Sequence, residues 1–146
     1  MISNAKGFAR ALKNCGLQVA GDPNVDFTET HQVIVEVEYA KGPEIARRLE
    51  DNNIVCNYQA GPEDESFSAS GALRMRVAEM TRFGMETADF EQLPQYIFDV
   101  IAHNKIVKEE IIRLRSRFFK LQYCFSGEDF NKGLHKMAAF IDRSLD

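Results

Sequence analysis

Arg74 is the side chain in this sequence whose type and setting most clearly suggest chemistry. It lies in a short apolar stretch, residues 72–77, directly after a glycine-containing approach. An arginine is costly to bury without a partner, and its planar guanidinium matches the two oxygens of a carboxylate better than any other side chain does. From the residue types alone, an ion pair within the domain is the ordinary explanation, and a bound carboxylate ligand is the alternative.

Other residues of reactive type lack the spacing that chemistry requires. His31, His103 and His135 are far apart, and no Cys or carboxylate gives them metal-ligand spacing, so no metal site is expected. Cys56 and His31 could form a nucleophile–base pair on adjacent strands, but a small core residue beside a polar strand end is the safer interpretation. Residues 105–120 carry six basic and two acidic side chains, which is typical of a solvated helix surface.

The elements that must position Arg74 show the periodicities of a mixed α+β domain. Residues 31–38 alternate between two faces, which predicts a half-buried strand. Gly42 and Pro43 predict the start of a helix, because proline suits the first helical turn. The expected elements before the C-terminal half are a helix that ends before Gly16, strands over 17–20 and 31–38, a helix from 42 to 53, a strand over 54–57, a surface loop over 59–70 and a strand over 72–77.

The C-terminal half is predicted to be helical. Thr87 is expected to cap one helix, with Pro94 causing a kink or a delayed start. Residues 107–121 carry an apolar stripe at helical spacing, which predicts one long amphipathic helix. Ser126 and Asp129 resemble a capping box for a last helix that continues to residue 145. The predicted fold class is therefore α+β, with a small, mainly antiparallel sheet packed against helices and a helical C-terminal extension.

The segment around Arg74 resembles a known family. Residues 70–74 read Ser-Gly-Ala-Leu-Arg and residues 79–85 read Glu-Met-Thr-Arg-Phe-Gly-Met. Both are similar to the segment of serine (glycine) hydroxymethyltransferases whose Arg holds the carboxylate of the amino-acid substrate. The resemblance extends over about residues 4–101, and it implies the small C-terminal domain of a fold-type I pyridoxal-phosphate enzyme. It favours a substrate carboxylate, from serine or glycine, as the partner of Arg74.

The same resemblance implies a folate side to the site. Gln59 takes the place of a family Asn that helps to hold the folate, and Phe67 resembles an aromatic that packs on its aminobenzoyl ring. Gln keeps the amide on a longer arm, so tetrahydrofolate is one expected acceptor, and related retro-aldol or transaldol chemistry is the other. Arg76 and Ala78 stand where the family usually shows Gly and Pro, so the backbone after Arg74 is expected to differ.

The cofactor lysine is expected to lie outside this chain. Pyridoxal-phosphate enzymes need a Schiff-base lysine, and none of the eight lysines here sits in a context like the family's His-Lys motif. The chain is therefore predicted to be inactive alone, with a large domain as its missing partner and a homodimer as the complete enzyme. The alternative from another class is a free-standing, non-catalytic module that binds a partner or a small carboxylate.

Composition agrees with one compact unit. With 146 residues, 45% of them apolar, the chain is long enough for a sizeable core. Residues 1–104 are expected to form the small domain, and residues 105–146 a helical extension packed on it. A net charge of −4 gives no reason to expect nucleic acid or an anionic membrane as a partner. Three cysteines without metal spacing are typical of reduced thiols, which favours a cytoplasmic protein, and no apolar run approaches the length of a membrane span.

Overall fold

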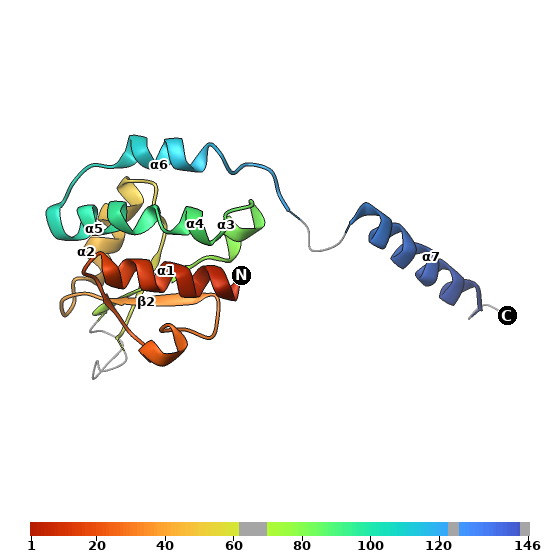
Figure 1. Ribbon diagram of the computed structural model, residues 1–146, viewed down its shortest axis with the longest axis horizontal. Coiled ribbons are helices and arrows are strands. Elements are labelled where there is room, and N and C mark those ends of the chain that lie inside the picture. The colour runs from red at the N-terminus through yellow and green to blue at the C-terminus, as the bar shows by residue number, and fades with distance from the viewer. Residues whose placement is uncertain (62–69, 123–125, 144–146) are drawn as a thin grey trace.

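The computed structural model describes residues 1–61, 70–122 and 126–143 (Figure 1). Its elements confirm the predicted α+β class: the strands form a small antiparallel sheet, and helices come before, between and after them in the sequence. They are α1 (Ile2–Asn14), β1 (Gln18–Val19), the short 3-10 turn η1 (Pro23–Val25), β2 (Gln32–Glu36), α2 (Gly42–Asp51), β3 (Asn57–Gln59), β4 (Ala72–Arg76), α3 (Ala78–Arg82), α4 (Thr87–Phe90), α5 (Leu93–His103), α6 (Lys108–Arg115) and α7 (Gly127–Arg143).

The strands form one four-stranded sheet in the order β1-β2-β4-β3, and every neighbouring pair is antiparallel. Helices α1 and α2 pack on one face of this sheet. The side chains that point to these helices are buried, namely Val33, Val35, Leu73 and Met75. The side chains on the opposite face are half-buried or exposed, namely Gln32, Ile34, Glu36, Arg74 and Arg76. The small Ala72 is the exception on this face and is buried. This period of two confirms the alternation expected of the strand at residues 31–38.

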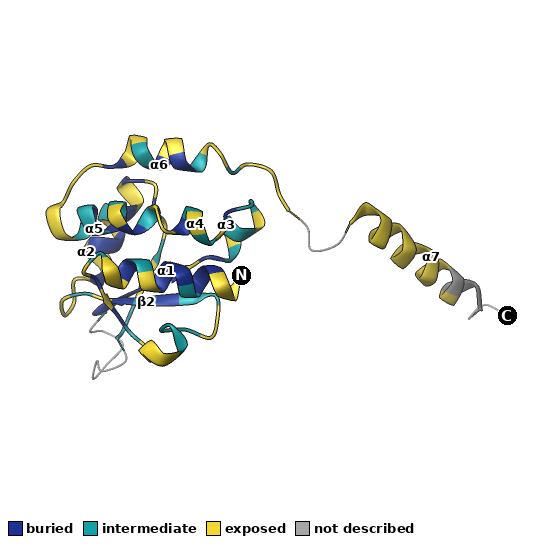
Figure 2. Cartoon of the chain, in the orientation of Figure 1, coloured by how far each residue is buried: buried dark blue, intermediate teal, exposed yellow. Residues whose placement is uncertain are grey.

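The core lies between the sheet and the helices (Figure 2). Phe8 and Leu12 of α1 and Leu49 of α2 are buried against it, and the rings of Phe8 and Phe90 lie 5.8 Å apart between centroids in a tilted pair. Burial of these side chains fixes how the sheet sits on the helices. It leaves the opposite face of β4, which carries Arg74, pointing away from the core.

The strand expected at residues 54–57 begins later, at Asn57. Asn53 has a left-handed backbone with φ of 62°, and the Ile54 N–H donates to the Leu49 carbonyl at 2.9 Å. Ile54 therefore still belongs to the turn that ends α2, although its side chain is buried. The helix from Gly42, which has proline in its first turn, is confirmed.

Two expectations about helix starts have different outcomes. Thr87 is not the cap: Glu86 is, because the Glu86 N–H donates to Asp89 Oδ2 at 2.9 Å in a capping box. The Thr87 hydroxyl instead donates to Asn4 Oδ1 at 3.0 Å, which ties α4 to α1. The delayed start at Pro94 is confirmed, because α4 ends at Phe90 and α5 begins with proline in its first turn.

The long helix expected over residues 107–121 is wrong beyond Arg115, where α6 ends. The chain turns at Ser116, and the Gln122 N–H donates to the Arg82 carbonyl at 2.6 Å, which holds the segment after α6 close to α3. The start of α6 is anchored by the buried Asn52, whose Oδ1 accepts from the Val107 N–H at 2.7 Å. None of the described helices is long and apolar enough to cross a bilayer.

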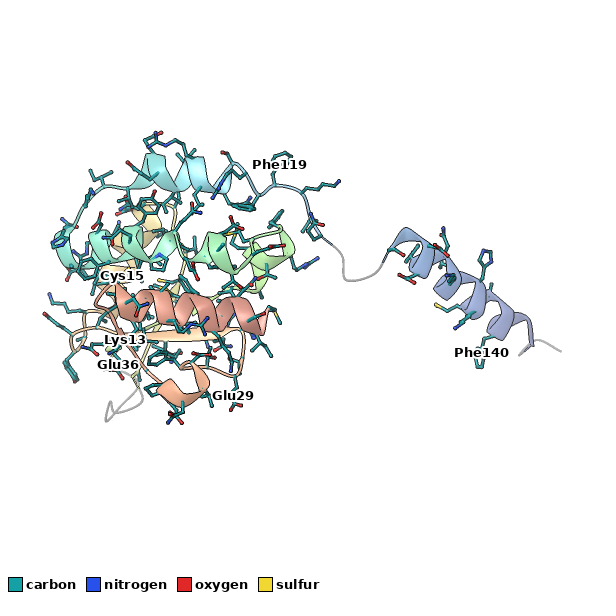
Figure 3. The ribbon with its side chains drawn as sticks, in the orientation of Figure 1. Lys13, Cys15, Glu29, Glu36, Phe119 and Phe140 are labelled. Carbon is teal, nitrogen blue, oxygen red and sulfur yellow. The ribbon has the colours of Figure 1, made fainter. Side chains whose placement is uncertain are left out.

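The capping box that opens α7 is confirmed. The Asp129 N–H donates to Ser126 Oγ at 3.1 Å, and Asp129 Oδ2 accepts from the Ser126 N–H at 3.1 Å. Side chains of α7 whose exposure is described are all exposed, and Figure 3 shows Phe140 of α7 and Phe119, after α6, projecting outward. The predicted end of this helix at residue 145 lies outside the described residues. The division of the chain between residues 104 and 105 stays a prediction.

Candidate functional site

Arg74 occupies the middle of β4, between β2 and β3. It lies opposite Ile34 in the pairing with β2 and opposite Asn57 in the pairing with β3. The side chain is half-buried, and its Nε atom is buried without a hydrogen-bond partner among the described residues. No carboxylate among residues 1–61, 70–122 and 126–143 forms an ion pair with it. The guanidinium is therefore a donor group that the described part of the chain leaves available to a ligand.

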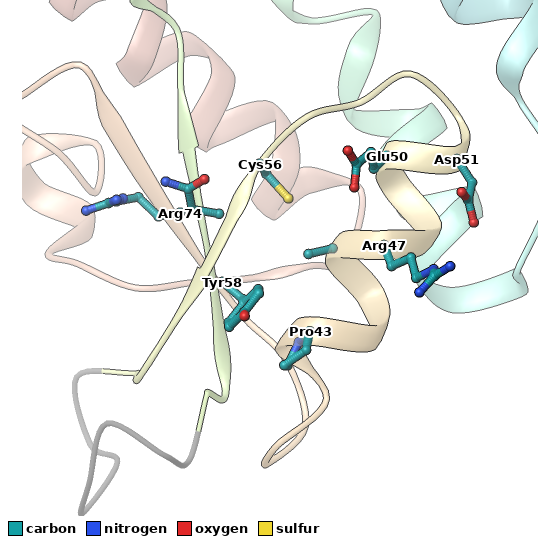
Figure 4. A pocket seen from close by; sticks show the side chains of 9 residues that line it. Pro43, Arg47, Glu50, Asp51, Cys56, Tyr58 and Arg74 are labelled. Atoms are coloured by element: carbon teal, nitrogen blue, oxygen red, sulfur yellow. The ribbon is translucent and has the colours of Figure 1, made fainter.

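The orientation of Arg74 follows from its neighbours on the strand. Leu73 and Met75 must face the core, and successive side chains of a strand point to opposite faces. Figure 4 shows the result: Arg74 extends to the side of β4 away from Cys56 and Glu50. The strand thus presents a cation on the face that the helices do not cover, and a fixed backbone holds the base of that side chain.

A cavity of about 670 Å³ lies beside β3 and α2, and Arg74 is one of the residues that line it. Its walls come from α2, from the segment of Cys56 to Tyr58 and from β4, and they are Pro43, Ala46, Arg47, Glu50, Asp51, Cys56, Asn57, Tyr58 and Arg74. A second cavity of about 580 Å³ lies under α6 and is lined mostly by apolar side chains such as Met75, Met80 and Met85. The first cavity has the mixed polar lining expected where a polar ligand enters.

Cys56 and His31 are not brought together as a catalytic pair. His31 precedes β2 and Cys56 precedes β3, and β4 lies between these two strands. Burial, and to a lesser extent the negative charge of Glu50, raises the pKa of the Cys56 thiol to about 11. A thiol so rarely ionised is a poor nucleophile, so the interpretation of Cys56 as a small core residue fits the geometry.

Cys56 should therefore react slowly with thiol reagents. A pKa of about 11 in place of 9.0 lowers the thiolate fraction at neutral pH about a hundredfold. We expect the alkylation rate of Cys56 in the folded chain to keep rising with pH until about pH 11, and to match that of an ordinary cysteine in denaturant. Mass-spectrometric mapping of iodoacetamide labelling against pH measures this, and a plateau below pH 9 would contradict it.

The other predicted site residues have different outcomes. Gln59 lies on β3 opposite Ala72. The register therefore places it on the same face of the sheet as Arg74, because Ala72 is two residues before Arg74 on β4. Phe67 lies outside the described residues. Asn57, directly opposite Arg74, was not predicted as a site residue, because only the strand register shows the two to be neighbours. Within the described chain, no cluster of His, Cys, Asp or Glu side chains has the arrangement of a metal site.

Comparison with known proteins identifies the family. Residues 1–97 match the family described as serine hydroxymethyltransferase. The chain belongs to the serine hydroxymethyltransferase family. This is a family of pyridoxal-phosphate-dependent transferases of one-carbon metabolism, and the resemblance proposed from the residues around Arg74 is confirmed.

Relatives and a solved structure show how much of the family protein is present. The serine hydroxymethyltransferases of Pyrobaculum aerophilum and Saccharolobus islandicus are 36% and 37% identical over 86% and 93% of this chain, which spans only 30% and 32% of their lengths. The crystal structure of L-threonine transaldolase from Pseudomonas fluorescens, in its internal aldimine state, matches 79% of this chain and 26% of its own, with 29% identity and a TM-score of 0.64. The chain thus corresponds to about a third of a family member.

The residues of this chain do not by themselves fit the family's cofactor. Pyridoxal phosphate requires a lysine amine inside a site. All of the lysines except the half-buried Lys6 are exposed, and none lines either cavity. Three of them are engaged in surface ion pairs, namely Lys41, Lys105 and Lys132. None of the eight lysines therefore places an amine inside either of these two cavities.

Proposed function

We propose that this chain is the small C-terminal domain of a pyridoxal-phosphate enzyme of the serine hydroxymethyltransferase type, and that Arg74 binds the α-carboxylate of serine or glycine. The observation that carries this proposal is the guanidinium of Arg74, half-buried on the face of β4 away from the core, with a buried Nε that has no hydrogen-bond partner in the described part of the chain. A carboxylate supplies the two acceptor oxygens that this fork-shaped donor lacks.

The role of Arg74 is to orient the substrate. Two parallel hydrogen bonds from one guanidinium fix a carboxylate in a plane, and with it the directions of the bonds at the adjoining carbon. Binding free energy is then spent on holding the reacting bond in a productive position. The base of Arg74 is held on a strand whose neighbours Leu73 and Met75 are buried, so this position is rigid. The groups that accept and donate protons belong to the remainder of the protein.

The acceptor side is assigned to β3 and the loop that follows it. Gln59 lies on the same face as Arg74, and we propose that it and Phe67 contact tetrahydrofolate. A second acceptor class is an aldehyde in transaldol chemistry. This alternative is supported by the structural match to an L-threonine transaldolase and by the longer Gln59 amide in place of the family's Asn.

The partners follow from the same proposal. A large domain with the cofactor lysine completes the site, the complete enzyme is a homodimer, and it works in the cytoplasm. Reading the coding sequence on the 5′ side of Met1, together with the neighbouring genes, tests this directly. A segment with a pyridoxal-phosphate lysine, fused or encoded nearby, is expected. Its absence from both places would favour a free-standing carboxylate-binding module.

The isolated chain is expected not to bind pyridoxal phosphate stably and not to cleave serine, because none of its lysines lines either cavity. Absorbance in the visible, recorded before and after borohydride, measures aldimine formation, and bovine serum albumin treated in parallel shows the level of non-specific surface reaction. A stoichiometric band that borohydride abolishes would place a cofactor lysine in this chain and overturn the assignment to a missing domain.

A further inference from the structure

The cavity under α6 is large for a protein interior and has no part in the proposed function. Its volume is about 580 Å³, whereas packed interiors hold few voids larger than a water molecule and small-molecule sites span roughly 300–1,000 Å³. Met75 contributes to its wall from the core face of β4, and Arg74, on the opposite face, does not line it. The cavity is therefore separate from the site built around Arg74.

The inner wall of this cavity is apolar. Its most deeply buried side chains are at most 4% exposed, namely Phe8, Met75, Val77, Met85, Phe90 and Ile97. The two buried side-chain nitrogens without a partner in the described part of the chain belong to Arg48 and Arg74, and neither residue lines it. A buried water needs roughly two to four polar partners, so an apolar occupant suits this wall better than water does.

The polar side chains that line the cavity lie at its mouth. Each of them is exposed or half-buried, namely Asn53, Arg76, Glu79, Arg115 and Ser116. The apolar Val55 and Ile112 are also exposed there, at 81% and 44%. Charges of both signs surround the opening, so it selects neither an anion nor a cation. A polar group carried past it would lose its hydrogen bonds with water and find no side-chain partner inside.

Helix α6 forms the outer wall, and contacts near its two ends tie it to the domain (Figure 1). Before the helix, the Val107 N–H donates to Asn52 Oδ1 at 2.7 Å, and at its end the guanidinium of Arg115 lies 4.4 Å from the centre of the Phe83 ring. Three methionines line the cavity as well, and their unbranched side chains adapt to the shape of an occupant. An occupant is thus enclosed between a fixed core and an anchored helix.

We propose that this cavity binds a neutral apolar small molecule, such as an aromatic ring or a short alkyl chain, and that α6 packs on that ligand. Binding removes apolar surface of the ligand and of the cavity wall from water, which is the favourable contribution to affinity. The proposal goes beyond the proposed function and does not depend on the role of Arg74.

Titration with toluene, followed by NMR of the chain labelled with ¹³C at its methionine methyl groups, tests the proposal. Met75, Met80 and Met85 line the cavity, whereas the exposed Met1 and Met137 do not and serve as internal controls. Toluene is expected to shift the first three signals saturably and to leave the other two in place. Phenol, which has nearly the same shape but carries a hydroxyl, should bind at least about fivefold more weakly.

A matched pair of variants tests the wall itself. Met80→Gln keeps the length of the side chain but adds an amide, and it is expected to weaken toluene binding at least about threefold. Met137→Gln, at a residue of α7 that is 63% exposed, should bind toluene as the wild-type chain does. Melting curves of both variants establish that they are folded, and the wild-type titration decides alone if Met80→Gln is not.

Several results would overturn the site. They are equal shifts of all five methionine signals, no saturable shift up to the solubility limit of toluene, phenol binding as tightly as toluene, or unchanged toluene binding in a folded Met80→Gln variant. None of these results bears on Arg74, whose role is tested separately by serine binding.

Discussion

Replacing Arg74 by lysine is expected to weaken serine binding by the complete enzyme roughly tenfold to over a hundredfold, and replacing it by alanine to weaken binding more. Lysine keeps the charge but loses the fork of donors that matches a carboxylate. One good charge-assisted hydrogen bond is worth about 1.5–3 kcal/mol, which sets this range of affinity. Spectra of the bound cofactor should change little, because the proposed function assigns the groups that hold it to the large domain.

The same two substitutions should leave the melting temperature of this chain nearly unchanged. Arg74 has no ion pair among the described residues, so its removal leaves no buried carboxylate without a partner. An arginine with a structural role predicts the reverse: a clear loss of stability, and weaker serine binding only as far as folding fails.

Calorimetric melting and serine titration of the same variants distinguish the two roles. Arg113→Ala serves as a control, because it removes an exposed arginine on α6 whose contact is a surface pair with Glu110. Unchanged serine affinity in Arg74→Ala would sink the binding role. A drop in melting temperature much larger than that of the control would point to an internal partner.

Much of the frame of the site could be predicted from local patterns. Alternation along residues 31–38 and the proline after Gly42 report backbone geometry directly, because side-chain direction on a strand and the fixed φ of proline are local properties. The position of Arg74 within a strand follows for the same reason, since the residues on either side of it are apolar.

The parts that could not be predicted depend on contacts between distant segments. Asn57 and Arg74 lie opposite each other because of the register of β3 on β4. The apolar Ile54 predicted a strand start, although the strand begins three residues later, at Asn57. Helix α6 ends at Arg115, and after it the Gln122 N–H donates to the Arg82 carbonyl of a segment distant in sequence. Periodicity shows which side of a helix is apolar, but it does not show where contacts with other segments end that helix.

Replacing Leu73 by alanine should lower the free energy of unfolding by about 2–5 kcal/mol, the range for a fully buried leucine truncated in a packed core. Leu73 is 0% exposed and lies opposite Val35 of β2 and Tyr58 of β3, so the cavity would open in the middle of the sheet. Rigid neighbours on both strands limit the collapse that could fill it.

Urea unfolding of Leu73→Ala beside Arg74→Ala makes the comparison sharp, because two adjacent residues of one strand are predicted to behave oppositely. Leu73→Met, which nearly conserves volume, should cost less than about 1.5 kcal/mol and shows that shape, rather than any change at this position, matters. If Arg74→Ala destabilised the chain as much as Leu73→Ala, side chains on both faces of β4 would contribute to the packing of the core. The face that presents Arg74 would then not be free for a substrate. If only Leu73→Ala is destabilising, the two faces of β4 have different roles. Leu73 and Met75 pack the strand against the helices, and that packing keeps the base of Arg74 in place on the other face.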